Sequence, residues 1–235
     1  MTGAIISSLY YNINEDRFHR MCVTGSFFFI EPDVAVTTWT NLCQERNKDP
    51  REMLHTEDYL FFDSKIRHFE TDENYGDGYQ CILIEREWLK ESKEKNITYI
   101  HLPQPVTDRF YEVSSEQARR KQWVVTEGFE YHHHLNMVNE IAYEFSFLPV
   151  KEARKVQFFR QAGIIESIED HDCIYNDLLQ IDRVKTIRTS CHNVPSMVGG
   201  PLLSREDGKV LGVISDQSDD SEDHYEGMIA VPLTV

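Results

Sequence analysis

The side chains best suited to catalysis lie around a glycine-rich stretch in the C-terminal third of the chain. Ser196 carries a hydroxyl just before the run Gly199-Gly200-Pro201. A serine hydroxyl becomes a nucleophile only when a neighbouring base takes its proton. Cys191 and His192 lie close in sequence, but adjacent residues of a strand point to opposite faces, so they form a poor dyad. Ser196 is either a displaced nucleophile or, the interpretation we favour, a loop serine bonded to its own backbone.

Three consecutive histidines, His132, His133 and His134, raise the question of a metal site. Successive residues of a strand cannot all face one ion, and no cysteine or carboxylate lies at a metal-like spacing from them. We expect no metal and no other cofactor.

The glycine-rich stretch predicts a hairpin. A short apolar strand follows Pro201, the turn Glu206-Asp207-Gly208-Lys209 comes next, and Val210–Ser215 forms a second apolar strand. Asp-Gly supplies the positive φ that a tight turn requires.

The whole segment resembles the nucleophile loop of trypsin-like (chymotrypsin-fold) serine proteases, in which Gly-Asp/Asn-Ser-Gly-Gly-Pro-Leu precedes a strand. On that pattern Ser196 takes the place of the first glycine, Met197 that of the acid or amide, and Val198 that of the nucleophilic serine. A valine has no hydroxyl to attack with. The resemblance also implies that Ser196 replaces a glycine of the oxyanion hole, where a side chain disfavours positive φ.

Two further segments resemble the same family. Gly25–Ile30, a turn and then Val34–Thr40, expected as a strand, are similar to the segment that ends in the catalytic histidine. Thr40 stands where that histidine should be, and a threonine hydroxyl cannot act as a general base near neutral pH.

The third motif, Asp-Ile-Ala-Leu-Leu-Lys-Leu in the family, carries the aspartate that orients the histidine. We align it with Tyr79–Glu85, which puts Tyr79 at the aspartate position. Asp77, two residues earlier, is the alternative if the alignment slips.

The resemblance implies an inactive protease fold, a pseudoprotease, because hydroxyl, imidazole and carboxylate are replaced together. We expect a protein–protein interaction or scaffolding module that holds a protein or peptide partner. The candidate residues of the old binding cleft are His192, Ser196, Met197, Gly199, Ser215, Asp216 and Gln217.

Two other functions remain open. One is an active serine endopeptidase whose catalytic residues are displaced from these positions. The other is an RNA-associated subunit, for which the basic clusters Arg119–Lys121, Arg154-Lys155 and Arg183–Arg188 are the evidence. The net charge of −16 argues against general binding to nucleic acid or anionic membranes, which requires clustered positive charge.

No stretch approaches the roughly 20 apolar residues of a membrane span, and the start of the chain does not read as a secretory signal. Five cysteines at scattered spacings give no disulfide framework, so we expect an intracellular setting, cytoplasmic or nuclear. Cys22 and Cys43 flank the second motif and are the one pair that spacing leaves open.

The chain of 235 residues is long enough for two small barrels that share a core. The fold that the resemblance implies is all-β, with two six-stranded antiparallel barrels. We expect the N-terminal barrel over residues 1–104 and the C-terminal barrel over residues 105–235, with the junction near Gln104–Thr107.

Overall fold

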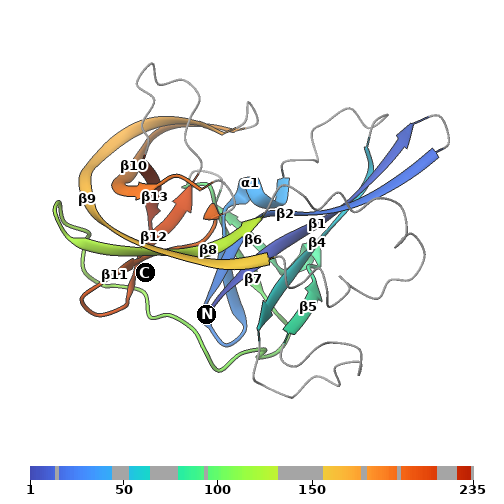
Figure 1. Ribbon diagram of the computed structural model, residues 1–235, viewed down its shortest axis with the longest axis horizontal. Coiled ribbons are helices and arrows are strands. Elements are labelled where there is room, and N and C mark those ends of the chain that lie inside the picture. Colours follow the sequence, from blue (N-terminus) through green and yellow to red (C-terminus); the bar gives the residue numbers. More distant parts are fainter. Residues whose placement is uncertain are drawn as a thin grey trace.

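A computed structural model of the chain describes residues 1–13, 16–43, 53–63, 79–92, 95–131, 156–175, 179–194, 197–215 and 227–233. Almost all of its regular structure is β-strand, which confirms the all-β class (Figure 1). Within the described residues, no helix is both long and apolar enough to cross a membrane.

The N-terminal half is a seven-stranded antiparallel sheet with strand order β5-β4-β1-β2-β3-β7-β6. Its elements are β1 (Thr2–Ile13), β2 (Asp16–Glu31), β3 (Val34–Thr37), α1 (Trp39–Cys43), β4 (Met53–Asp63), β5 (Tyr79–Leu83), the 3₁₀ turn η1 (Arg86–Trp88), β6 (Leu89–Ser92) and β7 (Ile97–His101). The sheet curls but, within the described residues, no ladder joins its end strands β5 and β6. This half is therefore a curled half-barrel rather than a closed six-stranded barrel.

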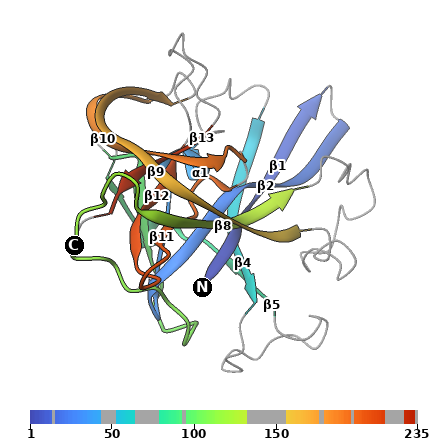
Figure 2. The same cartoon turned by 60° about the vertical axis from the view of Figure 1, so that its left-hand side comes forward.

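The C-terminal half is a closed antiparallel barrel of the expected six strands, in the order β10-β13-β12-β11-β8-β9 (Figure 2). Its strands are β8 (Trp123–Tyr131), β9 (Val156–Tyr175), β10 (Leu179–His192), β11 (Pro201–Ser204), β12 (Val210–Ser215) and β13 (Gly227–Pro232). In a closed barrel each of these strands has a partner on both sides. The predicted junction near residues 104–107 falls in the connection between β7 and β8.

The long hairpin of β1 and β2 shows how the sequence forms the curled sheet. The two strands pair from Thr2 opposite Phe28 to Ile13 opposite Asp16. Phe27, Phe28 and Phe29 are all fully buried although neighbouring residues point to opposite faces. Both faces of β2 are therefore covered at this point, one inside the curled sheet and the other against the barrel.

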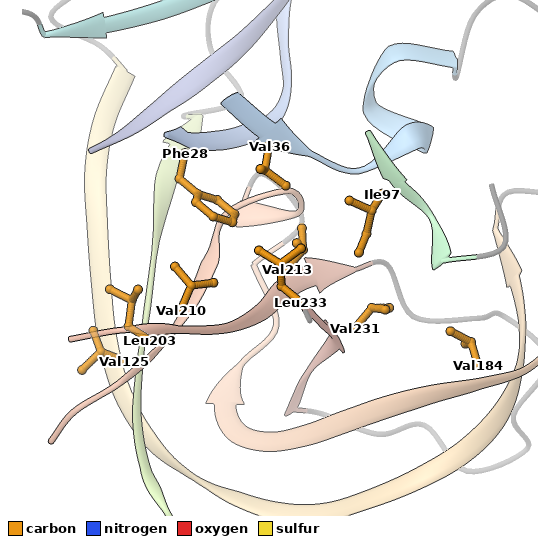
Figure 3. Close-up of a cluster of buried hydrophobic side chains, with 10 residues drawn as sticks. All are labelled: Phe28, Val36, Ile97, Val125, Val184, Leu203, Val210, Val213, Val231 and Leu233. Atoms are coloured by element: carbon orange, nitrogen blue, oxygen red, sulfur yellow. The ribbon is translucent and has the colours of Figure 1, made fainter. Parts of the chain in front are cut away.

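One hydrophobic cluster joins the two halves. Phe28, Val36 and Ile97 of the sheet pack with residues of the barrel such as Val213 and Val231 (Figure 3). A second cluster lies in the sheet, centred on Phe27 and Phe29, a third lies inside the barrel, and a fourth contains Ala4, Ile6, Phe61 and Phe129. The shared cluster fixes the ends of β3, β7 and β12 beside one another, and the candidate site lies there.

Candidate functional site

The candidate site begins where β3 ends. The sequence predicts a strand through Thr40, but β3 stops at Thr37 and α1 begins at Trp39. The first N–H groups of a helix need partners outside it, and Asn96, far away in the sequence, supplies partners for two of them. Trp39 N donates to the carbonyl of Asn96 at 3.2 Å, and Thr40 N donates to Oδ1 of Asn96 at 3.1 Å.

Asn96 lies at the centre of a buried polar chain. Its Nδ2 donates to Thr40 Oγ1 at 3.4 Å and to Ser215 Oγ at 3.1 Å. The Thr40 hydroxyl also donates to Thr38 Oγ1 at 3.3 Å. Asn96 has φ of 51°, in the left-handed region that asparagine tolerates better than most residues. All four side chains are almost completely buried.

The structure brings Asn96 beside Thr40, whereas Tyr79 begins the end strand β5, where its backbone pairs with Asp63. The segment Asn96–Leu102 reads Asn-Ile-Thr-Tyr-Ile-His-Leu, which matches the family's aspartate motif with an amide in place of the carboxylate. This second match was the available signal for Asn96, and our alignment on Tyr79 overlooked it. Asp77 lies outside the described residues.

The glycine-rich loop places Val198 against the other half of the molecule. The Val198 carbonyl accepts hydrogen bonds from Ser26 N at 2.7 Å and from Asn41 Nδ2 at 2.9 Å. Asn41 Nδ2 lies 3.0 Å from Thr37 Oγ1 as well. The Val198 side chain is only 2% exposed.

Gly199 follows with a backbone that only glycine accepts comfortably. Its φ is +87°, and a Cβ at this position would lie 2.2 Å from the Ser26 carbonyl oxygen and 2.4 Å from Thr37 Oγ1. Its N–H donates to the carbonyl of Ile214 at 2.7 Å, which ties the loop to β12. The loop is thus held by both halves.

The other candidate cleft residues separate by burial. Met197 and Ser215 are buried, 0% and 3% exposed, while His192 is exposed at the end of β10. Gln161 brackets His192, because its Nε2 donates to the His192 carbonyl at 2.7 Å and its Oε1 accepts from the His192 N–H at 3.0 Å. Ser196, Asp216 and Gln217 lie outside the described residues.

Several other sequence candidates stay untested. His132–His134 and Arg154-Lys155 fall outside the described residues, and so do the side chains of Cys22 and Cys43. Among the described residues no cluster of histidine, cysteine or carboxylate side chains could hold a metal ion. In the basic cluster at 119–121, Arg119 forms an ion pair with Glu116, and Arg120 Nε donates to the Glu166 carbonyl at 3.0 Å.

Away from the site, one buried carboxylate connects the two halves. Glu127 of β8 accepts hydrogen bonds from Tyr111 and, at 3.2 Å, from Thr2 Oγ1. Its other oxygen lies 3.2 Å from Arg160 Nε. Burial, and then the hydrogen bond to Glu127, raise the pKa of Tyr111 above its ordinary value.

No family model matches the chain, and no curated protein matches its sequence. Solved structures do match, each over 97% of this chain. The Rv3671c protease of M. tuberculosis in its active form is 14% identical, with a TM-score of 0.55 over 75% of that chain. The MamO protease domain of Magnetospirillum magneticum is 11% identical, with a TM-score of 0.56 over 90% of that chain.

Deg5 is also 11% identical, with a TM-score of 0.54 over 83% of its chain. Similarities at this level of identity establish the fold and leave the chemistry to the residues of this chain. The chain has the two-halved β fold of the trypsin-like serine proteases.

Proposed function

We propose that this chain is a proteolytically inactive trypsin-like domain that acts as a protein–protein interaction or scaffolding module. The observation that carries the proposal is the hydrogen-bonded pair of Thr40 and Asn96, together with the valine at position 198 of the glycine-rich loop. A serine protease requires an imidazole, a carboxylate and a hydroxyl nucleophile at one point. Here a threonine and an asparagine are hydrogen-bonded to each other, and a valine follows on the glycine-rich loop.

The burial of this group supports the proposal further. Thr40 is 0% exposed, and its N–H and hydroxyl are both engaged in hydrogen bonds. The partners of its hydroxyl are an amide and another hydroxyl, and neither is a base that takes a proton near neutral pH. The polar chain therefore contributes to stability, as satisfied buried hydrogen bonds do.

An interaction role fits the part of the old cleft that stays exposed. His192 is exposed, and its backbone is fixed by Gln161, whose Nε2 also lies 3.8 Å from Met197 Sδ of the loop. Asp216 and Gln217 follow β12 in sequence and belong to the same proposal. The proposed function also includes an intracellular location.

A fluorophosphonate probe tests the inactive state directly. We expect no covalent labelling of the folded chain and no cleavage of a broad peptide library, with active trypsin as the positive control. Labelling that maps to Ser196 or to any other serine would instead establish a displaced nucleophile and an active endopeptidase.

A site-specific photo-cross-linker tests the interaction role. We expect a photoreactive residue at His192 to capture a discrete partner in native extract. The same residue at Phe110, which is also exposed, is the matched control. Capture that is equal at both positions, or absent from both, would refute a partner site beside the loop.

A further inference from the structure

Among the residues that the structure describes, β5 has no partner strand on its outer edge, and it carries an apolar face. Ile84 N donates to the Asp58 carbonyl at 2.8 Å, and Ile82 is opposite Leu60 in the same ladder. Hydrogen-bonded and non-hydrogen-bonded pairs alternate along an antiparallel ladder. The N–H and C=O groups of Cys81 and Leu83 therefore point away from β4.

The side chains of the same two residues continue an apolar surface. Cys81 is in register with Phe61 and Ala4, and Leu83 with Tyr59 and Ile6, so these six residues form two rows across three strands. Ala4, Ile6 and Phe61 are buried in one cluster, and Tyr59 and Cys81 pack against it while only partly buried.

Residues of the barrel extend this surface on its other side. Phe129 belongs to the same cluster and meets Phe158 edge to face, with ring centroids 5.7 Å apart. Phe158 is 51% exposed, and Leu83 at the sheet edge is 38% exposed. We name the side chains of Tyr59, Cys81 and Leu83, which lie on β4 and β5, the edge patch.

The charges around the edge patch indicate the chemistry of its occupant. Exposed carboxylates of Glu85 and Glu87 follow β5 directly in sequence, with one exposed cation, Arg86, between them. The whole chain carries a net charge of −16. A peptide that brings lysine or arginine is therefore attracted to this edge, and an acidic peptide is repelled.

We propose that β5 is a docking strand for an extended peptide that adds to the sheet antiparallel or parallel to it. The peptide carries apolar side chains at alternate positions, two of them beside Cys81 and Leu83, and lysine or arginine at its flanks. The backbone groups of Cys81 and Leu83 supply the hydrogen bonds, and the edge patch supplies the apolar contact.

The proposal names a surface and a partner chemistry for the interaction module, and so rests on that proposed function. The two fail separately, however. Covalent labelling by a fluorophosphonate would refute the inactive state but would not bear on peptide binding at β5. Failure of peptide binding would refute the docking strand alone.

Amide hydrogen exchange of the free chain tests the premise. We expect the amides of Cys81 and Leu83 to exchange fast and those of Gln80 and Ile82 to exchange slowly, since the latter face β4. Slow exchange at Cys81 and Leu83 in the free chain would mean that a segment of this chain, such as residues 64–78, or a second copy already occupies the edge. That outcome overturns the proposal.

Peptide binding tests the partner chemistry. The probe is the fluorescent peptide Lys-Lys-Val-Thr-Val-Thr-Val-Lys-Lys, and we expect a Kd tighter than about 1 mM together with new protection at Cys81 and Leu83. Two controls are expected to bind at least about tenfold more weakly: the same peptide with glutamate for lysine, and one N-methylated at the amides that face β5.

Variants of the protein give a second, independent readout. Leu83→Lys adds a positive charge and removes apolar contact at the edge, so we expect a loss of affinity of about tenfold or more. Phe110→Lys, at another exposed apolar side chain, is the matched control and is expected to bind normally. No binding by the native chain, or equal binding by both variants, would refute the docking strand.

Discussion

Asn96 of the curled sheet donates its side-chain N–H to the hydroxyl of Ser215 in the barrel, at 3.1 Å. The same amide holds the first turn of α1 through Thr40. A single side chain thus joins the end of β12, the start of α1 and the start of β7. Its removal affects three elements together.

Asn96→Ala is therefore expected to lower the free energy of unfolding by about 3 kcal/mol. The change leaves buried donors and acceptors of Thr40 and Ser215 without partners, and it puts alanine at a left-handed φ. Urea denaturation followed by circular dichroism measures the loss. Asn193→Ala, at an exposed asparagine, is the matched control and is expected to change stability by no more than about 0.5 kcal/mol. Equal losses in the two variants would contradict the role of Asn96.

The two left-handed glycines of the C-terminal half give a matched pair. Gly199→Ala is expected to cost about 3 kcal/mol or more, because its Cβ would overlap the Ser26 carbonyl oxygen and Thr37 Oγ1. Gly208 has a similar φ of +73°, but no atom lies within 4 Å of its would-be Cβ. Gly208→Ala is expected to cost only the backbone term, about 1 kcal/mol. The comparison of the two by thermal denaturation isolates the steric term, and similar costs would refute it.

The raised pKa of Tyr111 leads us to expect that the folded chain loses stability at alkaline pH. Burial and the hydrogen bond to Glu127 raise the pKa of Tyr111 in the folded state above the ordinary value of 10.0. Above that pH the unfolded chain releases the phenol proton while the folded chain retains it, so stability falls as pH rises. Below that pH the phenol is protonated in both states, so it does not make the folding stability depend on pH.

Urea denaturation at a series of pH values between about 8 and 11 measures this slope, with Tyr111→Phe as the variant. We expect the difference in stability between native chain and variant to shrink in alkali, since the native chain alone carries this phenol. A difference that stays constant across the series would refute the assignment.

Val198→Ser tests how far the site is from catalysis. The variant places a hydroxyl at the position that the resemblance assigns to the nucleophile, while Thr40 and Asn96 supply neither base nor carboxylate. We expect no fluorophosphonate labelling at position 198, and a stability loss of about 1 to 2 kcal/mol from placing a hydroxyl in a buried apolar position. Trypsin labelled in parallel is the control, and any labelling of the variant at this position would show that a base is present after all.

The fold was accessible from the sequence because its signals are local. Short sequence patterns mark the limits of individual strands. Examples are the run Gly199-Gly200-Pro201, the turn Asp207-Gly208 and the apolar run before Thr37. The closed barrel formed as expected. The lack of a ladder between β5 and β6 among the described residues was not predictable, because closure depends on the pairing of two short strands at opposite ends of the sheet and no single segment encodes that pairing.

The site illustrates the same boundary. Thr40 and Val198 could be identified as candidate site residues from the sequence, because each lies in a short and continuous motif. Asn96 is recognised by what it touches, namely the N–H of Thr40 and the hydroxyl of Ser215, which come from two other elements. Two segments of the sequence can be aligned with the aspartate motif, and the structure places Asn96 against Thr40 and Tyr79 on the end strand β5.

The Val198 carbonyl also bears on how a partner is received. Ser26 and Asn41 of one half both donate to this oxygen of the other half, deep between the sheet and the barrel. Separating the two halves at this point would break both hydrogen bonds together, and only water could then bond to the freed groups. If a partner binds beside the loop, as proposed above, it meets a preformed surface, so its association rate should be set by diffusion and charge rather than by a slow rearrangement of this chain.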